Sequence, residues 1–153
     1  MAGTAARRTL DALLNDARSR IERLEPAEAY AALADGALLV DIRPDGVRER
    51  EGIVPGSLHV PRTVLEWRLA PDSPWRNPHV GPLDTQVVLM CDHGCSSILA
   101  AATLVDLGFS RAGDVIGGFE AWRDAGLPVA SVDGSSEDGL PGMGAPAASV
   151  ESH

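Results

Sequence analysis

The chain has 153 residues, 44% of them hydrophobic, which is enough for one compact domain with a core of its own. Its formal net charge is −9 and its 13 basic residues are all arginines, a balance that argues against a nucleic-acid partner and against binding to an anionic membrane surface. No apolar run approaches the roughly 20 residues of a membrane span, and the first residues lack the apolar core of a signal peptide, so we expect a cytoplasmic protein.

The amino-terminal third alternates between helical and strand patterns. Apolar residues at helical spacing from 7 to 20 predict an amphipathic helix, and Glu25-Pro26 begins a second helix that ends at Asp35-Gly36. Residues 37–42 form a short continuous apolar run, as expected of a strand buried in a parallel sheet. Asp41 and Arg43 stand at its end, so we expect them at the carboxyl edge of the sheet, where open α/β sheets place their sites.

The middle of the chain predicts shorter elements. Residues 43–52 are charged and predict a loop with a short helix, while Ser57 to Val60 predicts another strand. Residues 63–69 allow one or two helical turns. The segment 70–84 contains four prolines and therefore predicts an irregular surface excursion.

The stretch from 86 to 107 carries the chemistry. Gln86 to Met90 predicts a buried strand that leads into Cys91, and apolar residues at helical spacing from Ser97 onward predict a helix. Small residues and a glycine between them let several backbone N–H groups point inward at a helix N-terminus, and this makes an anion nest. The nest and the helix dipole favour a thiolate, the reactive form of cysteine. We therefore predict that Cys91 is the nucleophile. The residues that we expect to bind the anionic substrate or the anion formed on the sulfur are those of the loop, Asp92, His93, Gly94, Cys95, Ser96 and Ser97.

The carboxyl-terminal part completes an alternating pattern. Gly113 to Ile116 predicts a strand and Phe119 to Ala125 a last helix. Alternating strands and helices predict an α/β fold with a central parallel sheet flanked by helices on both faces. Residues 131–153 are rich in Ser, Gly, Pro and Ala, and they predict a disordered tail. The predicted organisation is an amino-terminal helix at 1–20, a domain at 21–130 and this tail.

Four segments together resemble a known family. They read LVDIR at 39–43, IVPGSLHVP at 53–61, VVLMC at 87–91 with Gly94 three residues on, and IGGFEAWRDAGLPV at 116–129. In this order and spacing the chain resembles a single-domain rhodanese, a sulfurtransferase. The resemblance implies a rhodanese-like α/β fold, a persulfide on Cys91 and ping-pong transfer of sulfane sulfur from thiosulfate or a persulfide to cyanide, a thiol or a protein cysteine. The implied partners are small sulfur-containing anions or thiols and, as an alternative acceptor, a sulfur-accepting protein.

The loop departs from the common rhodanese pattern Cys-x-x-Gly-x-Arg because Ser96 stands at the arginine position. A dianionic donor gains from a fixed cation, so either Arg62 or Arg68 reaches the pocket, or the natural donor is a monoanionic persulfide. In the related phosphatases the loop is one residue longer and an arginine clamps phosphate, whereas the corresponding residue here is Ser97. This absence argues against phosphoryl transfer.

The other candidate site residues each have two interpretations, one structural and one functional. Asp41 and Arg43 either tie the sheet edge to nearby loops or border the pocket, and Trp67 is either a core residue or a pocket wall. His93 is either a solvated loop residue or a proton-transfer group. Cys95 is either a small loop residue or a thiol that resolves oxidised Cys91, and it supports a second hypothesis, a redox switch or noncatalytic binding module that uses the thiol pair.

Two cysteines four positions apart do not make a disulfide framework in a chain of this size. They fit a reducing compartment and a reactive or redox role. No cysteine or histidine grouping has the spacing of a zinc site, so we expect neither a metal ion nor a cofactor.

Overall fold

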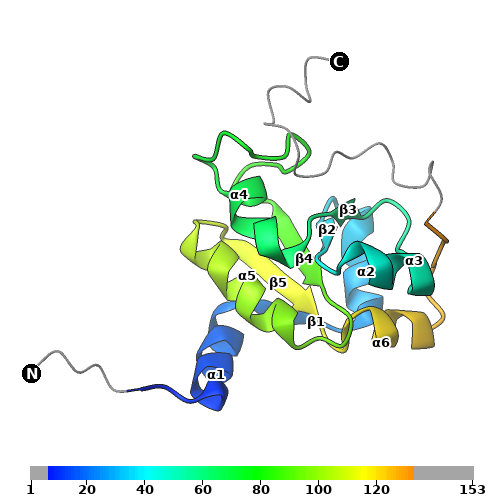
Figure 1. The fold of residues 1–153 in the computed structure, drawn as a ribbon, viewed down its shortest axis with the longest axis horizontal. Helices are drawn as coiled ribbons and strands as arrows, with labels where there is room; N and C mark the ends of the chain where they lie inside the picture. Colours follow the sequence, from blue (N-terminus) through cyan, green and yellow to red (C-terminus); the bar gives the residue numbers. More distant parts are fainter. Residues whose placement is uncertain (1–6, 133–153) are drawn as a thin grey trace, which may run out of the picture.

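A five-stranded sheet forms the centre of the molecule, which the computed structural model describes over residues 7–132 (Figure 1). The strands lie in the order β1-β5-β4-β2-β3, and every neighbouring pair is parallel. Their bounds are β1 (Glu22–Leu24), β2 (Leu38–Asp41), β3 (Leu58–His59), β4 (Gln86–Met90) and β5 (Arg111–Val115). All five carboxyl ends therefore point to one edge, where loops from different parts of the chain meet.

Helices cover both faces of this sheet, with α1, α4 and α5 on one face and α2, α3 and α6 on the other (Figure 1). Their bounds are α1 (Leu10–Arg20), α2 (Pro26–Ala34), α3 (Asp45–Glu51), α4 (Leu65–Leu69), α5 (Ser96–Asp106) and α6 (Gly118–Asp124), with a 3₁₀ turn at Arg62–Val64. The predicted fold class is confirmed. None of the helices in the described part of the chain is long and apolar enough to cross a bilayer.

The central strand β4 shows why the sheet needs two layers. Val87 and Leu89 pack among residues of α4 and α5, while Val88 and Met90 pack on the opposite side with Trp122 of α6. Each of these side chains is almost completely buried, and each fully buried apolar side chain of this size contributes about 1.5–3 kcal/mol. A continuous apolar run, rather than an alternating one, is what a strand buried on both faces requires.

Local sequence fixes where the amino-terminal helices begin. Thr9 accepts a hydrogen bond from the N–H of Ala12 and caps α1, and Ala17 then packs this helix against α5. Glu25 and Glu28 form a capping box at the start of α2, with the Glu28 carboxylate accepting from the Glu25 N–H at 2.8 Å. Both helices lie where their spacing predicted them.

Strand β1 is the element that the sequence pattern did not predict. It has three half-buried residues and pairs with β5 so that Arg23 stands opposite Asp114. Gly113 makes this pairing possible, because a Cβ atom at that position would collide with the carbonyl oxygen of Glu22. The predicted tail spans 131–153, and all of it beyond residue 132 lies outside the described residues, as does the start of the chain before residue 7.

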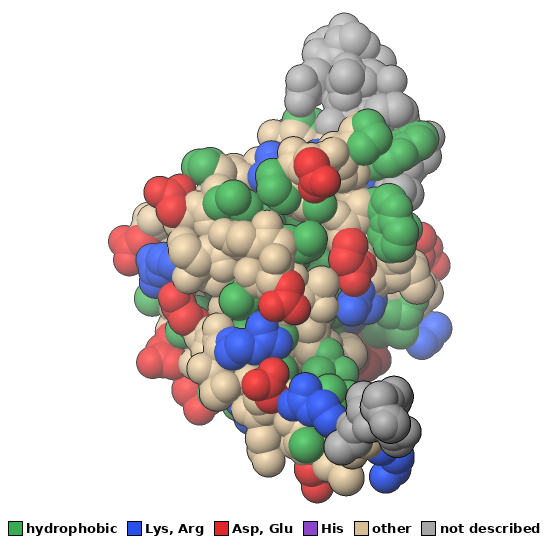
Figure 2. Space-filling model, turned by 90° about the vertical axis from the view of Figure 1, so that its left-hand side faces the viewer, with side chains coloured by type: hydrophobic (Ala, Val, Ile, Leu, Met, Phe, Trp, Pro, Cys, Tyr) green, Lys and Arg blue, Asp and Glu red, His purple; other side chains and the backbone are tan. Residues whose placement is uncertain are grey.

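The surface carries charges of both signs. On the face shown in Figure 2, arginine and carboxylate side chains are interspersed, and neither sign forms a continuous patch. Several of these charges are paired across elements, as where Arg20 of α1 meets Asp106 of α5 at 2.9 Å. Exposed pairs of this kind contribute about 0–1 kcal/mol each, so the fold depends on its two apolar layers and not on them.

Candidate active site

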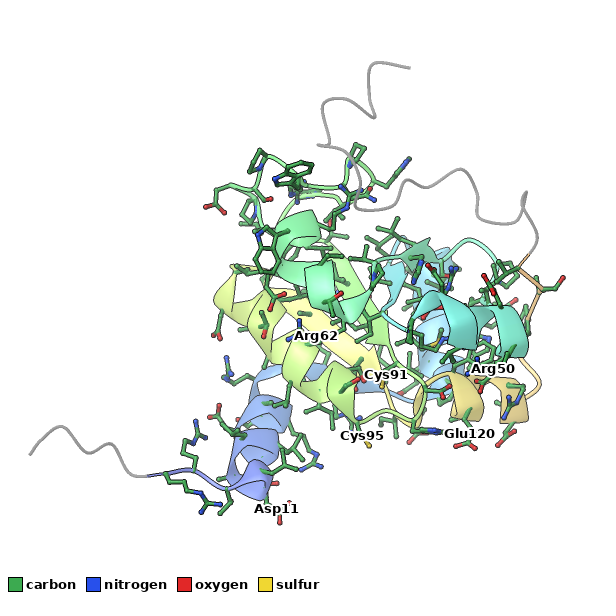
Figure 3. The ribbon with its side chains drawn as sticks, viewed as in Figure 1. Asp11, Arg50, Arg62, Cys91, Cys95 and Glu120 are labelled. Carbon is green, nitrogen blue, oxygen red and sulfur yellow. The ribbon has the colours of Figure 1, made fainter. Side chains whose placement is uncertain are left out.

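Cys91 lies at the carboxyl end of β4, and α5 begins five residues later at Ser96. The side chain is buried, with 6% of the residue exposed, whereas Cys95 is exposed; both thiols are free. Figure 3 shows Cys91, Cys95 and Glu120 at the same edge of the molecule, where β4 ends and α5 and α6 begin. The strand, loop and helix are those predicted around this cysteine.

The loop curls around the sulfur because two of its carbonyl groups are hydrogen-bonded to the start of α6. The carbonyls of Cys91 and Asp92 accept from the N–H groups of Phe119 and Glu120 at 2.8 and 3.1 Å, which docks the loop on the start of α6. Gly94 then adopts φ +82° and donates its N–H to Cys91 Sγ at 3.1 Å. A Cβ atom on Gly94 would come within 2.5 Å of the backbone nitrogen of Gly117, so glycine is required there for space as well as conformation.

The surroundings of the sulfur favour its ionised form. Burial raises the pKa of the Cys91 thiol, but hydrogen bonds from the hydroxyl and N–H of Ser97, the Ser96 hydroxyl and the Gly94 N–H outweigh burial, and the net pKa is lowered. A lowered pKa increases the fraction of thiolate, which is the nucleophilic form. The loop thus suits thiolate chemistry, which the predicted role of Cys91 requires.

Two charged residues that the sequence did not single out stand behind this loop. Asp114 of β5 is completely buried and accepts a hydrogen bond from the Ser97 hydroxyl at 2.7 Å. Arg23 of β1 holds both oxygens of that carboxylate, with Nε at 2.9 Å and Nη2 at 3.0 Å, and the same Nη2 reaches the Gly94 carbonyl at 3.2 Å. A charge within a buried strand needs a partner, and this was the signal available at Asp114.

Asp41 and Arg43 form a second buried cluster at the end of β2. The Arg43 guanidinium donates to both Asp41 oxygens at 3.0 and 2.8 Å and to the Gly52 carbonyl at 2.8 Å. It also stacks 3.9 Å above the Phe119 ring, and Arg48 adds a further contact to Asp41 at 3.1 Å. These contacts tie β2 to α3 and α6, which is the structural reading of the two residues.

The three residues expected as possible pocket walls have other contacts. Arg62 pairs with Glu66 at 3.1 Å, and the buried Arg68 donates to the carbonyl of Trp75 at 2.6 Å. Trp67 is half exposed and lines a hollow formed by residues 66–74, which includes none of the loop residues 91–97. The residues whose pKa values the charge of Cys91 raises are instead Arg23 and His93.

His93 and Asp92 form the outer side of the loop. His93 is exposed and lies between two carboxylates, with Nδ1 at 3.1 Å from Glu120 and Nε2 at 3.4 Å from Asp92. The hydrogen bond to Glu120 and the charge of Asp92 raise the pKa of His93. On the other side of Asp92, a hydrogen bond between its carboxyl and that of Glu51, together with burial, raises the pKa of Glu51.

Within residues 7–132, no group of three or more His, Cys, Asp or Glu side chains is arranged to hold a metal ion. What this edge of the sheet offers is an activated thiol, surrounded by hydroxyl and N–H donors that can hold a negative charge on sulfur. Fold and site together define an α/β protein built for thiolate group transfer.

Comparison with known proteins identifies the family of this chain. Residues 25–125 match the profile of the rhodanese-like domain. The chain belongs to the rhodanese-like domain family, as its motifs suggested.

Three relatives illustrate the match. The thiosulfate sulfurtransferase GlpE of Pseudomonas entomophila is 35% identical over 120 residues, which cover 78% of this chain and 99% of the relative. A solved protein of unknown function from Rhodopseudomonas palustris, described as a possible tyrosine phosphatase, is 38% identical with a TM-score of 0.74, covering 85% of this chain and all of that one. The polysulfide-sulfur transferase homodimer of Wolinella succinogenes is 25% identical with a TM-score of 0.65, covering 82% of this chain and 89% of that one.

Proposed function

We propose that Cys91 carries the transferred sulfur in this chain, which is a rhodanese-type sulfurtransferase. In the first half-reaction the Cys91 thiolate attacks the sulfane sulfur of the donor and forms a Cys91 persulfide. With thiosulfate the donor's S–S bond breaks and sulfite leaves, so that the persulfide keeps one negative charge on its outer sulfur. In the second half-reaction an acceptor such as cyanide or a thiolate attacks that outer sulfur and releases the Cys91 thiolate.

The observation that carries this proposal is the hydrogen bond from the Gly94 N–H to Cys91 Sγ at 3.1 Å. It belongs to a loop whose backbone is curled by the contacts with α6, and the loop lowers the pKa of the thiol that it surrounds. We infer that the N–H groups of residues 92–97 hold the outer sulfur of the persulfide, because a terminal sulfur anion needs fixed donors in a partly buried site.

The donor class follows from the same loop. Relatives named as thiosulfate sulfurtransferases support thiosulfate, and the loop contains no arginine, so we also infer use of persulfides with a single charge near the reacting sulfur. The acceptor is cyanide, a small thiol or the cysteine of a sulfur-accepting protein. These three share the property of attacking sulfane sulfur.

Intact mass after incubation with thiosulfate or with glutathione persulfide tests the proposal. We expect wild-type protein to gain the mass of one sulfur and to lose it when cyanide is added. Cys91→Ser should gain none and should keep the fold, because a serine hydroxyl is not ionised at neutral pH and cannot carry a persulfide. Cys95→Ser is the matched control and should load like wild type; loading that depends on Cys95 instead of Cys91 would overturn the assignment.

An aryl phosphate distinguishes sulfur transfer from phosphatase activity in the same preparation. The solved neighbour described as a possible tyrosine phosphatase makes this comparison necessary. In this chain Ser97 stands where an arginine would clamp phosphate, so phosphoryl transfer lacks its main source of charge stabilisation. We expect no Cys91-dependent hydrolysis of the aryl phosphate under conditions in which thiosulfate loads Cys91.

A further inference from the structure

The geometry points to a positioning role for Arg23 and Asp114: together they decide whether the single hydroxyl proton of Ser97 is donated to Asp114 or to the sulfur of Cys91. This inference rests on Cys91 being the nucleophile of the proposed function. It concerns two residues from β1 and β5, strands that supply none of the loop: β5 lies beside β4, and β1 lies on the far side of β5.

The contacts form a closed circuit around the sulfur. The Cys91 thiol donates to Ser97 Oγ at 3.4 Å, the Ser97 hydroxyl donates to Asp114 at 2.7 Å, and Arg23 holds both oxygens of Asp114. From the other side, Arg23 binds the carbonyl of Gly94, whose N–H donates to the same sulfur. Ser97 and Asp114 are completely buried, so no bulk water competes for these bonds.

Ser97 has one proton and faces two acceptors. While Cys91 is a thiol, its S–H points to Ser97 and the Ser97 proton points to Asp114, as the structure shows. When Cys91 ionises, the sulfur needs a donor, and the Ser97 hydroxyl can serve it only by turning away from Asp114. The Ser97 hydroxyl therefore lowers the Cys91 pKa only if its proton leaves the hydrogen bond with Asp114.

Arg23 makes that release easier. Its two N–H groups occupy both oxygens of Asp114, so the carboxylate remains satisfied after the Ser97 proton has turned away. Its positive charge also balances the buried negative charge of Asp114, which would otherwise oppose a thiolate nearby. Arg23 is thus a cation that supports the thiolate, although it lies behind the loop and not in the substrate's path.

The hydroxyl proton would turn twice in each catalytic cycle. Charge leaves Sγ when the persulfide forms, because the negative charge moves to the outer sulfur, and the Ser97 proton returns to Asp114. Charge returns to Sγ when the acceptor removes the outer sulfur, and the hydroxyl then donates to the departing thiolate. Ser97 touches the reacting sulfur and is a catalytic residue in this sense, while Arg23 and Asp114 act through it.

The titration of the Cys91 thiolate tests this inference without any sulfur donor, so its failure and the failure of the proposed function are distinguishable. All variants are made in a Cys95→Ser background, which leaves Cys91 as the only cysteine of the chain. The thiolate is followed by its ultraviolet absorbance and by the pH dependence of alkylation. Arg23→Met removes the cation and leaves the negative charge of Asp114 without a counter-charge. We therefore expect the midpoint of the Cys91 titration to rise by about one pH unit.

Asp114→Asn should move the midpoint in the opposite direction. It frees the Ser97 proton for the sulfur and leaves the charge of Arg23 uncompensated, and we expect the midpoint to fall by about half a pH unit or more. The double variant Arg23→Met, Asp114→Asn should return close to the parent. A pair that only scaffolds the loop would shift both single variants the same way, toward an ordinary thiol.

Arg111→Met is the matched control, because Arg111 and Glu22 also join β5 to β1 through two N–H···O contacts, at 3.1 and 3.3 Å, but Arg111 is exposed and Glu22 only half-buried. Its thiolate midpoint should not move. Shifts of the same sign in Arg23→Met and Asp114→Asn, or no shift in either, overturn the inference. If Arg23→Met does not fold, Asp114→Asn decides alone: a lower midpoint supports the inference, and an unchanged or higher midpoint overturns it.

Discussion

Asp41 and Asp114 are two completely buried carboxylates held by arginines in similar ways, yet they do different work. Arg43 binds both oxygens of Asp41, and Arg23 binds both oxygens of Asp114. Both lie toward the carboxyl edge of the sheet, Asp41 as the last residue of β2 and Asp114 one residue before the end of β5. Burial and ion pairing alone do not tell them apart.

Their remaining contacts do. The Asp41 cluster continues to the Gly52 carbonyl and the Phe119 ring, so it joins backbone segments and closes the α3 side of the fold. The Asp114 cluster continues to the Ser97 hydroxyl and to the Gly94 carbonyl. The Ser97 hydroxyl and the Gly94 N–H are in turn hydrogen-bonded to the sulfur of Cys91. A buried ion pair acquires a functional role when its hydrogen bonds end on a reacting atom.

The largest expected effect is a loss of folding stability in a variant of the Asp41 cluster. Asp41→Asn leaves Arg43 with a neutral partner in a dry site, and breaking a buried pair in this way costs about 3–5 kcal/mol. We expect urea unfolding to show that loss with an unchanged dependence on urea concentration. The Cys91 thiolate midpoint of the variant that remains folded should match the parent. A shifted midpoint would show that the two clusters are coupled, and the comparison would fail.

Gly94→Ala tests the loop backbone on the Asp114 side. The φ of +82° costs about 1–2 kcal/mol for any residue with a Cβ, and the Cβ would also press on the nitrogen of Gly117, for which overpacking adds about 1–3 kcal/mol. We expect this loss in urea unfolding, together with a fall in sulfur-loading rate of more than about tenfold because the Gly94 N–H leaves the sulfur.

Gly126→Ala provides the control for that variant. Gly126 has a similar φ of +77°, but a Cβ there meets nothing within 4 Å. It should lose only the conformational part of the stability and should load sulfur at the parent rate. Equal losses in the two variants would mean that the loop tolerates a side chain at Gly94 and that its docking on α6 is not required.

The difference between the clusters also shows what sequence could reveal. A buried strand, a loop of small residues and an amphipathic helix are local patterns, and they placed Cys91 and its loop correctly. Asp41 and Arg43 are two residues apart, so their mutual contact was also within reach of a local pattern. Arg23 and Asp114 are 91 residues apart and meet only because β1 pairs with β5.

Strand β1 itself was hidden because three half-buried residues carry no apolar run to recognise. Trp67 shows a second limit of local patterns. It was a candidate pocket wall, but α4 turns its indole toward the proline-rich excursion, where it lines a separate hollow. Side-chain direction on a short helix depends on packing partners that lie far away in the sequence, and no local pattern reports them.

Ser96→Arg sharpens the question of which cation serves the site. Arg23 supports the thiolate from behind the loop, whereas the exposed Ser96 position faces the side open to solvent. A guanidinium there should raise the thiosulfate kcat/KM more than the persulfide kcat/KM, by about tenfold if the added charge contributes about 1.4 kcal/mol to the transition state. The gain should shrink with added salt.

Arg62→Ala is the companion variant for donor choice. The Arg62 charge is already paired with Glu66, so its removal should change the ratio of the two kcat/KM values little. A selective loss of thiosulfate use in Arg62→Ala, with no gain in Ser96→Arg, would assign the donor's charge partner to Arg62 instead.

The smallest expected effect concerns the exposed outer side of the loop. Glu120 raises the pKa of His93 above its ordinary value of 6.5, so Glu120→Gln should lower it, as a titration of the His93 ring by NMR would show.

A raised folded-state pKa means that this contact stabilises the protein fully below the ordinary His pKa and that the stabilisation is lost as the pH rises through the folded-state pKa. The stability gap between parent and variant should therefore be present in mildly acidic buffer and close in alkaline buffer. His93 is exposed, so solvent screens the interaction and the gap stays small. A thiolate midpoint that moved with Glu120→Gln would extend the electrostatic control of Cys91 from the Arg23 side of the loop to its solvent side.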